Sequence, residues 1–233
     1  MPAQPRVLFV LTSHDKMGST GKPTGWYLPE FAHPYQVLAS HCAITIASPF
    51  GGESPLDPSS VDASKDDKLS VDFHKNSSHL WKNTEKLSSF SGKASDFDAV
   101  FFVGGHGPMF DLATDAVSHA LINDFHARGK VISAVCHGPA ALINVKLPNG
   151  KFLIDGQAVT GFSNVEEDQV GLTEAMPFSL ENELNKSSGG KYQKAGDAWA
   201  PKVVVSESGK LITGQNPASA AGVGEAIKKA INA

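Results

Sequence analysis

Apolar residues gather along the chain in short, nearly continuous runs, separated by longer stretches in which apolar and polar residues mix. Four of these runs are rich in β-branched and aromatic residues, at 6–11, 43–48, 99–104 and 131–136. Strands that are covered on both faces show such runs, because neither face of the sheet meets water. The runs therefore predict strands of a parallel sheet.

Helix-like segments lie between these strands. They cover 29–41 and 116–129, and the second ends in Arg128-Gly129, which is typical of a helix stop. A closing helix is expected over 216–233, with Asn216 as its N-cap and a proline in its first turn. This alternation predicts an α/β fold with a doubly wound, mostly parallel sheet flanked by helices.

Two segments interrupt the alternation with a pattern typical of β-hairpins, 151–162 and 202–214, because each has a Gly-containing turn between apolar runs. The stretch from about 54 to 95 is polar, with sparse apolar anchors, and is interpreted as an inserted helical segment or lid. A loop is expected over 185–199. The chain is thus predicted to form a single domain over 1–233.

Composition narrows the class of protein. Hydrophobic residues make up 41% of the 233 residues and charged residues 19%, as in an ordinary globular domain. The net charge of −4 and the absence of a Lys/Arg stripe argue against nucleic-acid binding. The apolar run at 7–11 is too short for a signal peptide, and no later run could span a bilayer. We therefore expect no membrane partner and a cytoplasmic location, compatible with nuclear presence.

The two cysteines, Cys42 and Cys136, are far apart and form no CxxC pair, which argues against a disulfide scaffold or a thiolate zinc site. Cys136 ends a strand and precedes His137-Gly138-Pro139, so it stands at a strand-to-helix junction on the carboxyl edge of the sheet. A helix dipole there favours the thiolate. A strand-end cysteine is more often packed core, but this turn sequence favours a reactive thiol.

A glycine loop follows the neighbouring strand. Its residues 104–107 include Gly105 and His106, whose backbone N–H groups could hold an oxyanion, although a plain tight turn has the same sequence. Glu30 follows the first strand and could enter the same crevice, although composition favours a solvent-exposed carboxylate. The nine histidines show no metal-ligand spacing, so no metal and no cofactor are expected.

Five segments carry a family resemblance: "GWYLPEFAHPY", "FFVGGHGPMFDL", "AVCHGPAAL", "AVTGFSNVEED" and "LITGQNPASA". Together they closely resemble the ThiJ/PfpI superfamily, in its fungal heat-shock-chaperone-like branch, described as glutathione-independent glyoxalase III. The resemblance runs from the first strand to the last helix. It implies a flavodoxin-like fold shared with class I glutamine amidotransferases, a small 2-oxoaldehyde substrate and a homodimer.

The resemblance also implies roles for individual residues. Cys136 matches the nucleophile, His137 the histidine beside it, and Glu30 the glutamate that hydrogen-bonds the sulfur. The acidic partner of the histidine falls in "NVEED", where alignment favours Glu167, with Glu166 and Asp168 as competitors. The implied reaction converts methylglyoxal to lactate through a cysteine hemithioacetal and an enediol, with N–H groups near Gly105 and Gly138 stabilising oxyanions.

Other functions stay open at this point. The same thiol could serve an oxidation sensor, and the protein could be a stress-response holdase chaperone. A cysteine peptidase or amidase would share the strand-to-helix junction. An amidotransferase triad is disfavoured, because such enzymes take their histidine from a downstream segment and no histidine follows His137.

Overall fold

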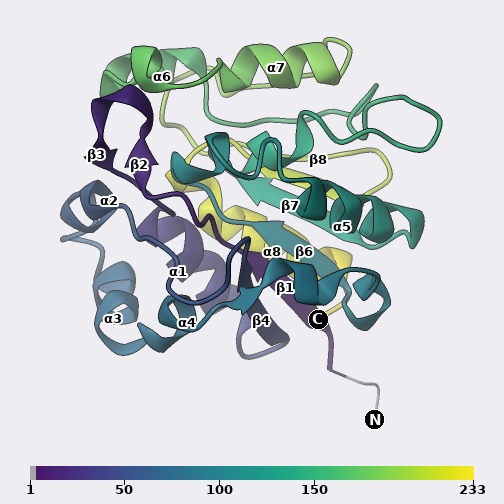
Figure 1. Ribbon diagram of the computed structural model, residues 1–233, viewed down its shortest axis with the longest axis horizontal. Helices are drawn as coiled ribbons and strands as arrows, with labels where there is room; N and C mark the ends of the chain where they lie inside the picture. The colour runs from purple at the N-terminus through teal and green to yellow at the C-terminus, as the bar shows by residue number, and fades with distance from the viewer. Residues whose placement is uncertain (1–3) are drawn as a thin grey trace.

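The computed structural model describes residues 4–233, which form a seven-stranded sheet with helices on both faces (Figure 1). Its strand order is β5-β4-β1-β6-β7-β9-β8, and every pairing is parallel except that of β8 with β9. The strands are β1 (Arg6–Val10), β4 (Ala43–Ser48), β5 (Glu85–Lys86), β6 (Ala99–Phe102), β7 (Val131–Val135), β8 (Val203–Val205) and β9 (Leu211–Gly214). The predicted doubly wound, mostly parallel sheet is confirmed.

The strand order sets where a site can form. The five longer parallel strands, numbered in chain order, lie as 2-1-3-4-5, which is the flavodoxin-like arrangement. Connections leave β1 and β6 in opposite directions, so a crevice opens between their carboxyl ends. All four residues of β6 and all five of β7 are buried, as their continuous apolar runs predict.

The helices cover the two faces as expected. Figure 1 shows α8 (Ala220–Ala230) behind the sheet and α5 (Ala116–Ala127) in front of it. The first long helix, α1 (Leu28–Leu38), packs against α8. Gly224 permits this approach, because a Cβ there would lie 3.1 Å from the Pro34 Cα. The helices predicted over 29–41 and 116–129 are confirmed, with ends shifted by at most three residues.

Three short α-helices lie in the segment 54–95, for which the sequence predicts an inserted helical segment or lid. It contains α2 (Pro58–Ala63), α3 (Lys68–Asn76), α4 (His79–Lys82), strand β5 and two 3-10 turns (Leu87–Phe90 and Ala94–Asp96). Its apolar anchors pack beside α1: the rings of Trp81 and Trp26 lie 5.2 Å apart and those of Phe73 and Phe31 5.0 Å. These contacts fix the segment next to the loop that follows β1. A function as a lid stays a prediction.

One of the two predicted hairpins is wrong. β8 and β9 form the hairpin of 202–214, but 151–162 forms none. Its first residues pair with the segment just before it: Leu153 N–H donates to Val145, next to an antiparallel bridge between Lys146 and Phe152. Its last residues pair with a more distant segment, because Val159 exchanges hydrogen bonds with Lys191 and Gln193. The two halves of 151–162 therefore pair with other segments and not with each other.

The structure differs from the sequence prediction in smaller ways as well. Strands β2 (Lys16–Met17) and β3 (Lys22–Pro23) form a short hairpin that the pattern does not predict. Two further helices are α6 (Asn164–Val170) and α7 (Leu180–Ser187), and the latter takes the first three residues of the predicted loop 185–199. The remaining 3-10 turns are Gly18–Thr20, Gly107–Met109, Gly138–Leu142, Thr173–Ala175 and Pro217–Ser219.

Asn216 stands before the last of these turns and α8, but its side chain makes no capping bond.

In the part of the chain that the structure describes, no helix has the length and apolar character needed to cross a membrane.

Candidate active site

Cys136 occupies a sharp turn directly after β7. Its φ angle is 59°, in the left-handed region that side chains other than glycine rarely adopt. Such backbone strain costs about 1–3 kcal/mol and persists only where neighbours enforce it. Here the Cys136 N–H donates to the Gly214 carbonyl and its carbonyl accepts from the Phe162 N–H, each at 2.9 Å. The strained turn therefore presents the thiol at the carboxyl edge of the sheet, as at a nucleophile elbow.

The same turn brings the neighbouring histidine onto the thiol. Cys136 Sγ lies 3.3 Å from His137 Nδ1, and both residues are buried. His137 Nε2 lies 2.6 Å from Glu167 Oε2 in the first turn of α6. A thiol, an imidazole and a carboxylate thus form one hydrogen-bonded chain, which is the arrangement of a nucleophile, its base and the group that orients the base.

The two competitors of Glu167 have other positions. Glu166 is buried, and its carboxylate accepts from the Ser163 hydroxyl and from the side chains of Gln215 and Asn216. Burial alone would raise the pKa of Glu166, but hydrogen bonds from Asn216, Ser163 and the Trp199 backbone hold it below its usual range. Asp168 is exposed. Of the three acidic neighbours, only Glu167 reaches the histidine.

His106 shares the same carboxylate. Its Nε2 lies 2.9 Å from Glu167 Oε1, and its ring centroid lies 4.2 Å from that of His137. Burial alone would raise the pKa of Glu167, but His137 and His106 hold it well below its usual range. An ionised carboxylate can only accept, so each Nε2 carries the proton that it donates. His137 Nδ1 therefore presents a lone pair to the Cys136 thiol when the ring is neutral.

The electrostatic surroundings keep His137 neutral. Burial lowers the pKa of His137 first, and the neighbouring His106 lowers it further, while Glu167 opposes both. The net direction is below the usual value of 6.5. A neutral imidazole with its proton on Nε2 is the form that can act as a base toward Cys136.

Glu30 is fully buried in the first turn of α1, so the composition-based expectation of a solvent-exposed carboxylate is wrong. It lies against Gly104, where an added Cβ would fall 2.2 Å from Glu30 Oε2 and 2.9 Å from Cys136 Cβ. Neither oxygen of Glu30 has a hydrogen-bond partner of ordinary geometry among residues 4–233. Burial raises its pKa well above the usual 4.5, which favours the protonated carboxyl.

The expectation of a resting thiolate at Cys136 is also wrong. Burial raises the pKa of the thiol well above 9.0. The element that follows is a 3-10 turn of five residues, Gly138–Leu142, and not an α-helix with a developed dipole. Cys136 is therefore a thiol at rest, and it needs a base to become a nucleophile.

A cavity of about 360 Å³ opens onto these residues. Gly105 and His106 line it, as predicted, and so does Phe162, whereas Gly138 packs against the Phe102 carbonyl and is not part of the lining. The full lining is Tyr27, Glu30, Ser59, Ala63, Gly105, His106, Cys136, His137, Phe162, Val170, Leu172, Trp199 and Pro217.

Several of these lining residues have no signal in the sequence. Ser59 and Ala63 come from α2 in the inserted segment, and Val170 and Leu172 come from the end of α6 and the turn after it. Tyr27 stands three residues before Glu30 in the same motif, which was the one available clue. Periodicity cannot show such residues, because they converge only through tertiary packing.

One group in residues 4–233 could hold a metal ion. His106, His137 and Glu167 each offer a ligand atom, and these atoms lie within 4.8 Å of one another. The same atoms form the two hydrogen bonds between the imidazoles and the carboxylate. A metal ion there would displace the protons that orient His137.

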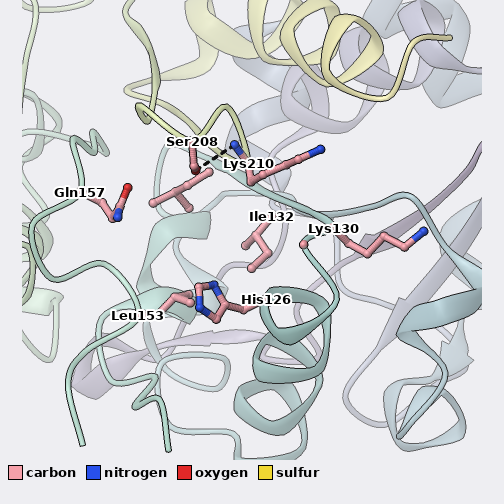
Figure 2. Close-up of a pocket in the computed structure, with 9 residues that line it drawn as sticks. His126, Lys130, Ile132, Leu153, Gln157, Ser208 and Lys210 are labelled. Carbon is pink, nitrogen blue, oxygen red and sulfur yellow. Dashed lines mark hydrogen bonds between the residues drawn. The ribbon is translucent and has the colours of Figure 1, made fainter. Parts of the chain in front are cut away.

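A second cavity, of about 250 Å³, lies at the opposite edge of the sheet, next to the starts of β7 and β9 (Figure 2). Its lining is His126, Gly129, Lys130, Ile132, Leu153, Gln157, Ser208, Lys210 and Leu211. None of these residues is a cysteine or carries a carboxylate. We refer to it as the amino-edge cavity and to the first as the catalytic cavity.

Comparison with known proteins agrees with the geometry of the catalytic cavity. The chain is 32% identical over 224 residues to "Glutathione-independent glyoxalase hsp3102" of Schizosaccharomyces pombe, covering 91% of this chain and 90% of that one. It resembles the structures of Candida albicans glyoxalase III (TM-score 0.81, 29% identity, 97% of both chains) and of the Francisella tularensis Rapid Encystment Protein 24 KDa (TM-score 0.90, 43% identity, 97% and 99%). Residues 25–230 match the profile of the DJ-1/PfpI family, and the chain belongs to that family.

Proposed function

We propose that this protein is a glutathione-independent glyoxalase of the glyoxalase III type, which converts methylglyoxal and water into lactate. The observation that carries the proposal is the chain from Cys136 through His137 to Glu167, which faces a cavity large enough for a small aldehyde. The names of the relatives support the same reaction. The protein's own sulfur takes the role that a free thiol has in other glyoxalases.

The first step forms a hemithioacetal. Because Cys136 is a thiol at rest, attack on the aldehyde carbon is coupled to transfer of its proton to His137 Nδ1, 3.3 Å away. The imidazolium passes this proton to the aldehyde oxygen, which leaves His137 neutral again. Glu167 stabilises the imidazolium while it exists, and His106 keeps Glu167 in position through its other oxygen.

The second step moves hydrogen between the two carbons of the substrate. His137 Nδ1 removes the proton from the sulfur-bearing carbon, and the electron pair forms an enediol with the neighbouring carbonyl. Return of a proton to the neighbouring carbon gives a lactoyl thioester on Cys136. Gly105, which lines the cavity, is the proposed donor to the oxygens that gain charge.

The third step releases the product. Water adds to the thioester carbonyl, the carbon–sulfur bond breaks and the sulfur regains a proton. Protonated Glu30 lies beside the sulfur throughout, where it can donate to the developing thiolate and position it. The sum is methylglyoxal plus water giving lactate and a proton, with no oxidant or reductant required.

An oxidation sensor is less well supported by this geometry. Readily oxidised cysteines are accessible and have a low pKa, whereas Cys136 is buried and its pKa is raised. The homodimer stays a prediction, which the elution volume of the purified protein in size-exclusion chromatography tests.

The direct test measures lactate formation from methylglyoxal in buffer without glutathione. We expect Cys136→Ala to lower kcat by about a thousandfold or more, because the covalent route needs the sulfur. Cys42→Ala is the matched control, since Cys42 is a buried cysteine outside the catalytic cavity, and it should retain turnover if it folds. Turnover by folded Cys136→Ala protein would overturn the proposal.

A further inference from the structure

The catalytic cavity is much larger than methylglyoxal requires. Its volume of about 360 Å³ lies in the range of roughly 300–1,000 Å³ that is typical of pockets for drug-sized ligands. Methylglyoxal is a three-carbon molecule whose only apolar group is a methyl. The groups that react with it, Cys136 and His137, are buried and are two of the 13 lining residues, so much of the cavity is left for another part of the substrate.

The unused part of the cavity is mostly apolar. Beyond the reactive residues it is lined by Ala63, Phe162, Val170, Leu172, Trp199 and Pro217, together with the hydroxyl-bearing Tyr27 and Ser59, and no lysine, arginine or aspartate contributes. Val170 and Trp199 are 41% exposed, and they are two of the five large apolar side chains that are exposed in residues 4–233. Exposed apolar residues that gather around a concave site mark a surface that binds an apolar ligand.

Trp199 is held in place without a ligand. Its φ angle is 66°, in the left-handed region, which is rare and unfavourable for a bulky residue. Its backbone N–H donates to buried Glu166 at 2.9 Å and its indole N–H to Gln169. A half-exposed tryptophan fixed at both ends loses little conformational entropy when a ligand binds to it. Backbone strain at an exposed aromatic residue points to a functional position.

Aromatic contacts connect the Trp199 ring to the reactive centre. The Trp199 ring meets Phe162 edge to face at 5.5 Å, and Phe162 lies 4.5 Å from the His137 imidazole. An aromatic wall therefore runs from the mouth of the cavity to the proposed base. A flat apolar group would lie along this wall when its aldehyde carbon is at Cys136 Sγ.

From this geometry we propose that the cavity selects 2-oxoaldehydes that carry an aryl or similarly bulky apolar group on the ketone carbon, and that Trp199 determines this preference. The inference rests on the proposed function and names its substrate class. The chemistry is unchanged: phenylglyoxal plus water gives mandelate and a proton, through the same hemithioacetal, enediol and thioester on Cys136.

The test compares kcat/KM for phenylglyoxal and methylglyoxal in glutathione-free buffer, with mandelate and lactate measured as products. We expect wild type to favour phenylglyoxal about tenfold, since one methylene group in an apolar pocket already discriminates by roughly 10–200-fold. Initial rates are used, because phenylglyoxal also modifies arginines; neither Arg6 nor Arg128 lines the cavity.

Trp199→Ala should lose about tenfold in kcat/KM for phenylglyoxal and less than twofold for methylglyoxal, and Trp199→Phe should recover most of the loss. Phe50→Ala is the matched control, because Phe50 is a 77% exposed aromatic residue that does not line the cavity. It should leave both values unchanged. Thermal unfolding of each variant shows that it is folded.

The outcomes separate this inference from the proposed function. If neither aldehyde is converted by wild type, the proposed function fails. If methylglyoxal is converted and phenylglyoxal has an equal or lower kcat/KM, only the substrate class is overturned. If folded Trp199→Ala loses the same factor for both aldehydes, the role of Trp199 in selectivity is overturned.

Discussion

The two cavities at opposite edges of the sheet have similar dimensions and different chemistry. The catalytic cavity measures about 360 Å³ and the amino-edge cavity about 250 Å³. In the first, the ionisable groups Glu30, Cys136 and His137 are buried. Cys136 contacts His137, and both Glu30 and Cys136 lie against Gly104. In the second, His126 and Lys210 are exposed, and Figure 2 shows the lysine side chain pointing away from Gln157.

The difference follows from the direction of the strands. Loops that leave the carboxyl ends of β1, β6 and β7 carry Glu30, His106 and Cys136 into one crevice, because the strand order reverses there. The loops at the amino ends of the strands are not brought together by this change in strand order. A hollow by itself is therefore weak evidence for a site, and burial of mutually perturbing ionisable groups is stronger evidence.

Of the substitutions that compare the two cavities, the largest loss of activity should come from changing Glu167. Glu167→Gln replaces an ionised acceptor of two imidazoles with a neutral amide, which cannot stabilise the His137 imidazolium. By analogy with other catalytic carboxylates, kcat for methylglyoxal should fall by roughly 10³–10⁴. Asp168→Asn, on the exposed side of the same helix, is the control and should stay near wild type. Near-normal kcat in folded Glu167→Gln would remove the carboxylate from the mechanism.

The pH dependence of kcat/KM should reveal the buried base. His137 must be neutral to accept a proton, and burial together with His106 lowers its pKa below 6.5. Activity should therefore be full above this pKa and fall about tenfold per unit as pH drops below it. His106→Asn should move this acid limb to higher pH, because a neighbour that disfavours the imidazolium is gone. An unmoved acid limb in a folded, active variant would contradict the coupling of the two histidines.

Substitutions at two glycines, Gly104 beside the reactive residues and Gly129 in the amino-edge cavity, should differ in their effect on stability. At Gly104 an added Cβ would lie 2.2 Å from Glu30 Oε2 and 2.4 Å from the Val135 carbonyl, so Gly104→Ala should destabilise the protein by about 2 kcal/mol or more. At Gly129 no atom lies within 4 Å, and the φ of 63° alone should cost about 1 kcal/mol. Urea unfolding measures both. Equal losses would show that the crowding at Gly104 relaxes.

The smallest effect is expected at the amino-edge cavity. His126→Ala and Lys210→Ala remove exposed side chains far from the reactive thiol, so kcat/KM for methylglyoxal should stay within about twofold of wild type. The same glutathione-free assay applies. A loss of tenfold or more in either variant would mean that the two cavities are functionally coupled.

Local patterns predicted much of the fold but not the backbone partners of every segment. The runs at 99–104 and 131–136 became strands because burial on both faces leaves a direct mark on composition. The two halves of 151–162 pair with segments on either side, near Val145 and Lys191, and not with each other. A hairpin pattern shows that side chains are buried, and it does not show which segment receives the backbone hydrogen bonds.

The sequence by itself determined which chemistry-bearing residues exist and in what order their motifs follow the strands: Glu30 after β1, Gly105 and His106 after β6, and Cys136-His137 after β7. The family resemblance favoured Glu167 among three acidic neighbours, and the tertiary structure decided between them, because only Glu167 meets the histidine. It also decided that Cys136 rests as a thiol and that Trp199 stands at the mouth of the cavity. The physical reason is that protonation, contact and exposure depend on groups brought together across the chain, which no local pattern encodes.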